Sequence, residues 1–211
     1  MKVLIVSAGN RPCKKLIEEE AMDSDYIIGV DKGNEYLYES NMIPNLMLGD
    51  FDSIDEEKLN NYIKNNNVYI RYPAEKDYTD TELAVIKSIE LGAKAVTILG
   101  CIGTRMDHTL GNIGLLYRYL EKNIEACIID ENNKIFMINK GITLKPSNFK
   151  YFSLVAFGGM VKGLSIKNAK YDLNNHDLFP YSTITISNEF KDKDVRIDFE
   201  TGTIIVAFTK D

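Results

Sequence analysis

The sequence predicts an α/β N-terminal domain, with a mostly parallel sheet and helices on both faces, followed by an all-β sandwich C-terminal domain. Up to about residue 130, short apolar runs alternate with segments in which apolar residues recur every three or four positions. Beyond that point the apolar runs are short and rich in β-branched and aromatic residues, and none has useful helical spacing. We expect the two domains to span residues 1–132 and 133–211.

Strands and helices alternate along the first domain. Such alternation implies crossover connections and therefore parallel strands covered on both faces. The predicted strands are residues 2–6, 26–30, 46–48, 68–71, 95–99 and 125–129. The predicted helices are residues 16–22, 35–40, 55–65, 79–91 and 107–122.

Turn residues divide the second domain into short strands. Apolar and polar residues alternate on both sides of Gly202, so residues 196–208 are expected to form a hairpin. The predicted strands are residues 134–139, 151–157, 164–169, 183–187, 195–199 and 203–208. The predicted turns are residues 145–148, 158–159, 174–177 and 200–202.

The charge balance excludes a general nucleic-acid binder. The chain of 211 residues has 25 basic and 31 acidic residues and a net charge of -6, whereas nucleic-acid binders show a basic excess or stripe. No apolar run approaches the ~20 residues that a membrane helix needs, so no membrane association is expected. The N-terminus carries no signal-like segment, and a cytoplasmic location is therefore expected.

Acidic residues gather where predicted parallel strands end, which is the side on which open α/β sheets bind ligands. Asp50 and Asp52 follow the third strand. In an extended turn their side chains would point the same way and hold one hard cation. Alternatively, Ser53 caps the next helix and the aspartates only favour its N-terminus. The two interpretations are compatible.

A second acidic cluster contains Asp77 and Asp80. Thr79 and Glu82 have the spacing of a capping box, which explains those two residues but not the aspartates. Two acidic clusters after neighbouring strands would repel each other unless a cation neutralised them. Mg²⁺ prefers carboxylate and phosphate oxygens, so the clusters together indicate a metal–nucleotide site.

A positively charged side chain, Arg105, follows the fifth predicted strand. Arg105 offers a planar fork suited to phosphate, and Asp107, His108 and Asn112 lie at the start of the next helix, whose N-terminus favours anions. The sequence contains no P-loop and no Gly-x-Gly-x-x-Gly fingerprint. Nucleotide binding would therefore use another architecture.

Taken together, these motifs resemble those of the thiamine pyrophosphokinase family. The resemblance covers residues 31 to 190, with five motifs in the family's order. They are Asp31-x-Gly33, Gly49-Asp-Phe-Asp-Ser-Ile54, Lys76-Asp77-x-Thr79-Asp80-x-Glu82, Gly100-x-x-Gly103-x-Arg105-x-Asp107-His108-x-x-x-Asn112 and Ser187-Asn188-Glu189-Phe190.

The resemblance implies pyrophosphoryl transfer from ATP to thiamine with release of AMP, a requirement for Mg²⁺, and a homodimer with active sites between subunits. It implies an α/β nucleotide-binding catalytic domain and a β-sandwich thiamine-binding domain. The chain has no Trp, so Phe179 or Tyr181 would have to supply the aromatic face for thiamine.

The resemblance also implies residue roles. Asp50, Asp52, Asp77 and Asp80 would be catalytic and hold the metal, and Arg105 would also be catalytic. Thiamine would meet Ser187 and Asn188. The nucleotide would be bound by Asp31, Gly33, Ser53, Thr79, Arg105, Asp107, His108 and Asn112.

Two other functions are compatible with parts of the sequence. A haloacid-dehalogenase-like phosphatase would use Asp50 and Asp52 as its nucleophile loop, although that loop normally follows the first strand rather than the third. A non-enzymatic nucleotide-sensing module would bind ATP without turnover. Detection of AMP formed from ATP and thiamine would separate both from the kinase.

Overall fold

The computed structural model describes residues 1–52, 54, 56–65, 68–73 and 77–211. These residues separate into two units, Met1–Glu131 and Asn132–Asp211. Among the described residues, no helix combines the length and the apolar character that a membrane crossing requires.

The first unit is built on a parallel sheet with the strand order β4-β3-β2-β1-β5-β6. The central strand β1 is apolar and buried on both faces, as a strand between two helical layers must be. The strands are β1 (Lys2–Val6), β2 (Tyr26–Val30), β3 (Leu46–Gly49), β4 (Tyr69–Arg71), β5 (Ala95–Leu99) and β6 (Glu125–Ile129).

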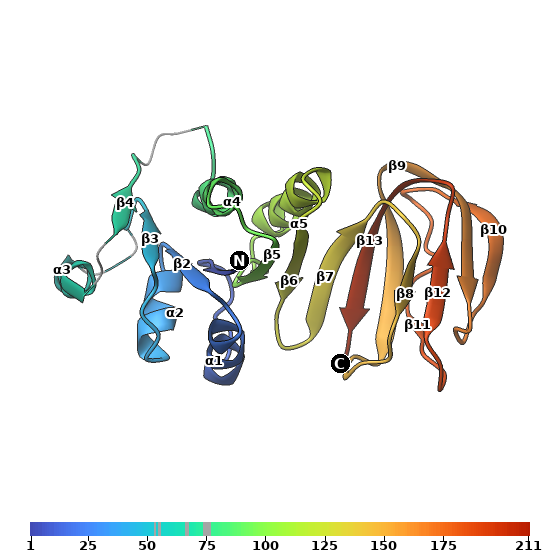
Figure 1. The fold of residues 1–211 in the computed structure, drawn as a ribbon, viewed down its shortest axis with the longest axis horizontal. Coiled ribbons are helices and arrows are strands. Elements are labelled where there is room, and N and C mark those ends of the chain that lie inside the picture. The colour runs from blue at the N-terminus through green and yellow to red at the C-terminus, as the bar shows by residue number, and fades with distance from the viewer. Residues whose placement is uncertain (53, 55, 66–67, 74–76) are drawn as a thin grey trace. The chain divides into compact units, whose positions relative to one another are not determined.

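Helices cover both faces of this sheet, with α1 and α2 on one face and α4 and α5 on the other (Figure 1). The α/β architecture predicted from the sequence is confirmed, and the helix ends differ from expectation by one or two residues. The helices are α1 (Lys14–Met22), α2 (Gly33–Glu39), α3 (Glu56–Asn65), α4 (Asp80–Glu90) and α5 (Met106–Glu121).

The strand order reverses beside β1. The chain adds β2, β3 and β4 on one side of β1 and then places β5 and β6 on the other side. The loops that follow β1 and β5 stay hydrogen-bonded beyond the strands, since Gly9 N donates to Gly100 O at 2.7 Å and Asn10 N to Ile102 O at 2.8 Å. Such a reversal is where open α/β sheets bind ligands at the carboxyl ends of their strands.

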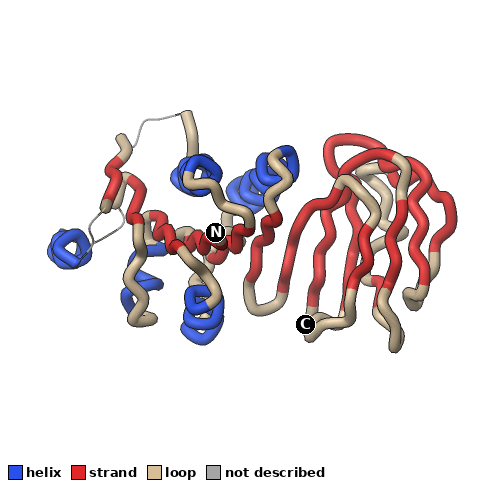
Figure 2. The backbone as a smooth tube through the Cα atoms, in the orientation of Figure 1, coloured by secondary structure: helices blue, strands red, loops and turns tan. Residues whose placement is uncertain are grey.

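The second unit is all β (Figure 2). The long strand β9 passes between two sheets: its first part pairs with β11 and β13, and its second part pairs with β10 and β12. Apolar side chains from both sheets form one core, so the predicted sandwich is confirmed. The strands are β7 (Asn133–Ile138), β8 (Ile142–Leu144), β9 (Tyr151–Lys167), β10 (Leu173–Leu178), β11 (Asn188–Glu189), β12 (Val195–Asp198) and β13 (Thr201–Thr209).

Two predicted turns and one predicted hairpin in this unit are wrong, because strand pairing is decided by residues that are distant in the sequence. The predicted turn at residues 158–159 lies inside β9, and the predicted turn at residues 174–177 lies inside β10. Asn175 has a positive φ of 47°, and the β10–β9 register shifts at this place, so turn-forming residues occupy an irregular strand. Residues 196–208 do not form a hairpin, because β12 and β13 both pair with β9.

The predicted strand at residues 183–187 is a turn. Its alternating pattern has the reverse of the expected orientation, since Thr185 is buried while Ile184 and Ile186 are exposed. Thr185 Oγ1 donates to Leu154 O at 2.6 Å and Leu154 N donates back to Thr185 O, which fixes the turn on β9. Alternation of apolar and polar residues alone does not distinguish a strand from a turn of this kind.

Gly33 is the first residue of α2 and brings that helix onto the end of β1. A Cβ at Gly33 would lie 2.0 Å from Val6 O, which leaves no room for any side chain. Gly33 therefore packs between α2 and β1, and its expected contact with the nucleotide stays a prediction. Gly114, in the interior of α5, differs in that no described atom outside its chain neighbours and the backbone of its own helix lies within 4 Å of its Cβ position.

Alanine at these two glycines should have opposite effects on stability. Gly33→Ala overpacks the α2–β1 contact and should lower the free energy of unfolding by about 1–3 kcal/mol. Gly114→Ala should raise it by about 0.5–1 kcal/mol, because alanine is the better helix former. Urea unfolding of both variants beside the wild type measures the difference. Equal effects of the two substitutions would contradict the described packing of α2.

Candidate active site at the strand-order reversal

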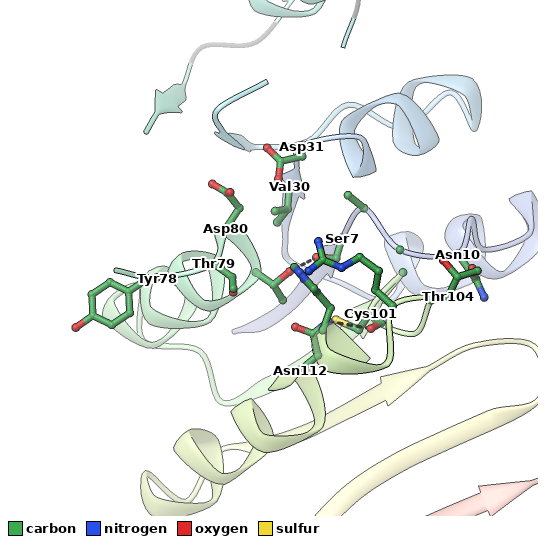
Figure 3. Close-up of a pocket in the computed structure, with 17 residues that line it drawn as sticks. Ser7, Asn10, Val30, Asp31, Tyr78, Thr79, Asp80, Cys101, Thr104 and Asn112 are labelled. Atoms are coloured by element: carbon green, nitrogen blue, oxygen red, sulfur yellow. Dashed lines mark hydrogen bonds between the residues drawn. The ribbon is translucent and has the colours of Figure 1, made fainter. Parts of the chain in front are cut away.

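A cavity of about 480 Å³ lies at the carboxyl ends of the strands around the reversal. The loops after β1, β2 and β5 and the first turns of α4 and α5 surround it (Figure 3). The lining residues are 7–10, 30–31, 78–81, 100–101, 103–105, His108 and Asn112.

The cavity brings together six of the residues expected at a nucleotide site, namely Asp31, Thr79, Asp80, Arg105, His108 and Asn112. Asp107 lies in an adjoining cavity of about 270 Å³, which also contacts Thr79, His108 and Asn112. Ser53 lies outside the described residues. Neither lining includes Gly33, Asp50, Asp52 or Asp77.

Asp31 is held at the edge of the cavity by an unusual backbone. Its φ of 46° is left-handed, and its N–H donates to Leu48 O at 3.0 Å. A Cβ at Gly49, whose own φ is 145°, would lie 1.8 Å from Asp31 Oδ1. Glycine at the end of β3 is therefore what allows the Asp31 carboxylate to lie there.

The loop after β3 does not have the extended form expected for a shared cation site. Phe51 has a φ of 61° and is buried against Met47, Ile54 and Leu59, as a packing residue between the two aspartates should be. Asp52 N donates to Asp50 Oδ1 at 3.1 Å, which closes a local turn. Asp52 is exposed to solvent.

The first turn of α4 places Asp80 in the cavity. Thr79 is the N-cap residue, and its Oγ1 accepts from Glu82 N at 3.2 Å, so the predicted cap is confirmed. Glu82 does not complete the capping box, because its side chain forms an ion pair with Arg118 of α5. The cap therefore fixes the helix start, while the ion pair ties α4 to α5.

The oxygen donors fit a magnesium ion that is shared with phosphate. Within the residues that the structure describes, no three His, Cys, Asp or Glu side chains form a metal-binding group. The expected gathering of Asp50, Asp52, Asp77 and Asp80 is therefore not found, and Asp77 is an exposed loop residue. Asp31 and Asp80 each bury one carboxylate oxygen at the cavity. Mg²⁺ typically takes one or two carboxylates and completes its shell with water and phosphate.

The cationic side of the cavity is Arg105. Its guanidinium pairs with the Asp107 carboxylate at 2.6 Å, and both side chains are largely exposed. The Arg105 hydrogen bond holds the pKa of Asp107 below its ordinary value. A guanidinium at a helix start is suited to a phosphate, which competes with Asp107 for the same donors.

The start of α5 is fastened to the loop after β5. Asn112 Nδ2 donates to Cys101 O at 2.8 Å, and Thr109 Oγ1 accepts from Gly103 N at 3.2 Å. Asn112 is thus a structural tie as well as a lining residue. Burial raises the pKa of the Cys101 thiol to about 12, so this cysteine stays protonated and is not a nucleophile.

In the second unit, the Asn188 side chain hydrogen-bonds the backbone of Tyr171. Its side chain accepts from Tyr171 N at 3.0 Å and donates to Tyr171 O at 2.8 Å, and the residue is only 3% exposed. The Asn188 side chain thus holds the backbone of Tyr171, and its expected contact with thiamine stays a prediction. Ser187 is exposed and has a left-handed φ of 57°.

Sequence reasoning missed the loop after β1. Residues 7–10 line the cavity, yet the segment carries no charged residue and no complete glycine fingerprint. Thr81 and Cys101 lie within the third and fourth motifs, but at positions to which the motifs assign no role. The available signal was position, because the loop follows the first strand of a predicted parallel sheet.

Comparison with known proteins places both units in one family. Residues 17–128 match the model of "Thiamin pyrophosphokinase, catalytic domain", and residues 140–204 match that of "Thiamin pyrophosphokinase, vitamin B1 binding domain".

Individual relatives agree with the family models. The thiamine pyrophosphokinase of Bacillus subtilis is 37% identical over 186 residues, which cover 87% of each chain. Its crystal structure aligns over the full length of both chains with a TM-score of 0.90 and 33% identity. A thiamin pyrophosphokinase family protein from Enterococcus faecalis aligns equally completely, with a TM-score of 0.89 and 30% identity. On this evidence the chain belongs to the thiamine pyrophosphokinase family.

Proposed function

We propose that this chain is a thiamine diphosphokinase that transfers a pyrophosphoryl group from ATP to the hydroxyl of thiamine and releases AMP. The observation that carries the proposal is the cavity at the strand-order reversal, which both Asp80 and Arg105 line. The chain also matches the catalytic-domain model of this family. In this proposal the first unit is the nucleotide-binding catalytic domain, and the second unit is the thiamine-binding domain.

The reaction is a displacement at the β-phosphorus of ATP. The thiamine hydroxyl oxygen forms a bond to this phosphorus while the bond to the α,β-bridging oxygen breaks. The bridging oxygen leaves with the electron pair as part of AMP, and the hydroxyl proton passes to a base. Such transfers depend on positioning and charge stabilisation more than on covalent catalysis.

Arg105 and the starts of two helices neutralise phosphate charge. The guanidinium exchanges Asp107 for a phosphate oxygen when ATP binds, since a phosphate offers the same bidentate geometry. Asp31, Thr79, Asp107, His108 and Asn112 line the two adjoining cavities in which the nucleotide would lie. Ser53 keeps a proposed nucleotide contact on the basis of its motif alone.

Carboxylates of this edge of the sheet hold Mg²⁺ in the proposal. Asp80 is the first candidate because it lines the cavity, with Asp50, Asp52 and Asp77 as the other motif carboxylates. Bound Mg²⁺ supplies positive charge to the phosphates of ATP. One of the carboxylates accepts the alcohol proton.

The thiamine surface is proposed to include Ser187 and Tyr171. Asn188 holds the backbone of Tyr171 in place through two hydrogen bonds. Thiazolium is a flat cation, and an aromatic face stabilises such a group. Phe179 and Tyr181 stack with ring centroids 5.4 Å apart, and Tyr181 is 82% exposed. This pair is the proposed replacement for the tryptophan that the chain lacks.

A homodimer with active sites between subunits is proposed as the assembly. Exposed apolar side chains on α5, Met106, Leu110 and Tyr117, support an interface on this unit. Use of ATP as the donor supports a cytoplasmic location.

The two alternative functions receive no support. A haloacid-dehalogenase-like phosphatase needs its nucleophile loop after the first strand, and Asp50 follows β3. A nucleotide sensor without turnover does not account for a match to the catalytic domain of an enzyme family.

Incubation of the purified protein with ATP, Mg²⁺ and thiamine tests the proposed function directly. Chromatography should show thiamine diphosphate and AMP in equal amounts. ADP and thiamine monophosphate as the products, or no conversion of thiamine, would contradict the proposal.

Asp80→Asn should lower kcat at least about 100-fold, because it removes a charge that acts on the transferring phosphates. Its stability should change by about 1 kcal/mol, because a charge that favours the N-terminus of α4 is lost while the shape of the side chain is kept. Glu90→Gln neutralises an exposed carboxylate in the last turn of the same helix and serves as the matched control. Steady-state kinetics that give both variants wild-type kcat would exclude Asp80 from the site.

Substitutions at Ser187 and Asn188 should separate effects on thiamine binding from effects on stability. Asn188→Ala leaves two partly buried backbone groups of Tyr171 without these partners and should cost about 1–3 kcal/mol of unfolding free energy. Ser187→Ala should change stability by less than about 0.5 kcal/mol but raise the KM for thiamine roughly 3- to 10-fold, with the KM for ATP unchanged. The thermal midpoint and the two KM values measure these effects. A Ser187→Ala enzyme with a raised KM for ATP alone would assign the motif to the other substrate.

A further inference from the structure

Two hydroxyl groups meet on the floor of the cavity. Ser7, the residue after β1, and Thr81, in the first turn of α4, place their oxygens 2.5 Å apart. Ser7 is only 2% exposed. The bond joins residues that are 74 positions apart in the sequence. Ser7 lies outside the five motifs, and Thr81 occupies an unassigned position of the third motif, between Asp80 and Glu82.

Ser7 has a second partner on a third element. Its backbone N–H donates to Leu99 O, at the end of β5, at 2.8 Å. Ser7 therefore joins the ends of β1 and β5 through its backbone, and the start of α4 through its hydroxyl.

The residue held in this way is next to Asp80. Asp80 and Thr81 are consecutive in the first turn of α4, which Thr79 caps. The other end of α4 is held separately, by a buried hydrogen bond of 2.7 Å between Ser88 Oγ and the Tyr119 hydroxyl of α5. The Ser7–Thr81 bond thus ties the first turn of α4 to the strand-order reversal.

We propose that Ser7 and Thr81 are positioning residues for pyrophosphoryl transfer. Their hydrogen bond sets the place of the first turn of α4, and with it the Asp80 carboxylate, relative to the phosphates. The inference rests on the proposed function. A misplacement of about 1 Å costs up to ~100-fold in rate when geometry limits the reaction, so the pair acts on kcat more than on substrate affinity.

Direct contact of each hydroxyl with the nucleotide is the competing explanation, because both residues line the cavity. The two explanations differ in additivity. Residues that act through one shared bond give a double variant no worse than the poorer single variant, whereas two independent contacts give losses that multiply.

The test compares Ser7→Ala, Thr81→Val, the double variant and Thr81→Ser. Each single variant should lower kcat about tenfold, with the KM values for ATP and thiamine changed less than about twofold. The double variant should match the poorer single variant, and Thr81→Ser, which keeps the hydroxyl, should recover most of the lost rate. Multiplying losses, or a loss seen in KM alone, would overturn the proposal.

Ser88→Ala is the matched control because it removes a buried hydroxyl at the opposite end of the same helix. It should lower the thermal midpoint but leave kcat at the wild-type value. Hydrogen exchange gives a readout that needs no turnover: Ser7→Ala and Thr81→Val should speed exchange of the amides of Glu82 and Leu83, and Ser88→Ala should not. Unchanged exchange there in both variants would overturn the proposal.

The wild-type enzyme separates the two possible failures. Absence of thiamine diphosphate with the wild type contradicts the proposed function. Wild-type turnover together with unaffected Ser7→Ala and Thr81→Val variants contradicts only the positioning role.

Discussion

The reversal of strand order beside β1 is the constraint on which the site depends. Because β2 and β5 flank β1, the loops after these three strands end at one edge of the sheet. Helices α4 and α5 start at the same edge and bring their N-terminal turns to the cavity. A phosphate ligand at this place meets backbone donors, helix starts and a guanidinium together, without a P-loop.

The residues around this edge divide into those that face the cavity and those that hold them. Asp80 and Arg105 line it. The first turn of α4 is bonded to Ser7 in the loop after β1, and the Arg105 guanidinium pairs with Asp107, two residues further along the start of α5. Asn188 has the same holding role in the second unit, through the backbone of Tyr171. Catalysis of phosphoryl transfer by positioning requires such supporting contacts as much as the charged groups themselves.

The sequence predicted the first unit well, because β1 to β6 and the helices between them have distinct apolar periods. It predicted the second unit as all β but not its pairing. The glycines within β9 and the asparagines within β10 look like turns locally, and they lie in strands because β9 pairs with β13 and β10 pairs with β9 on both sides of them. In the site, motifs identified charged residues such as Asp80, whereas Ser7 acts through a contact 74 positions away that no local pattern contains.

A crystal structure with Mg²⁺ and a non-hydrolysable ATP analogue tests the central claim most directly. The account predicts phosphate oxygens within hydrogen-bonding distance, about 3.2 Å, of the Arg105 guanidinium, with the Asp80 carboxylate on the metal and the loop of residues 7–10 against the nucleotide. Phosphates bound at the Asp50–Asp52 loop without contact to Arg105, or a nucleotide away from the β1–β5 edge, would contradict it.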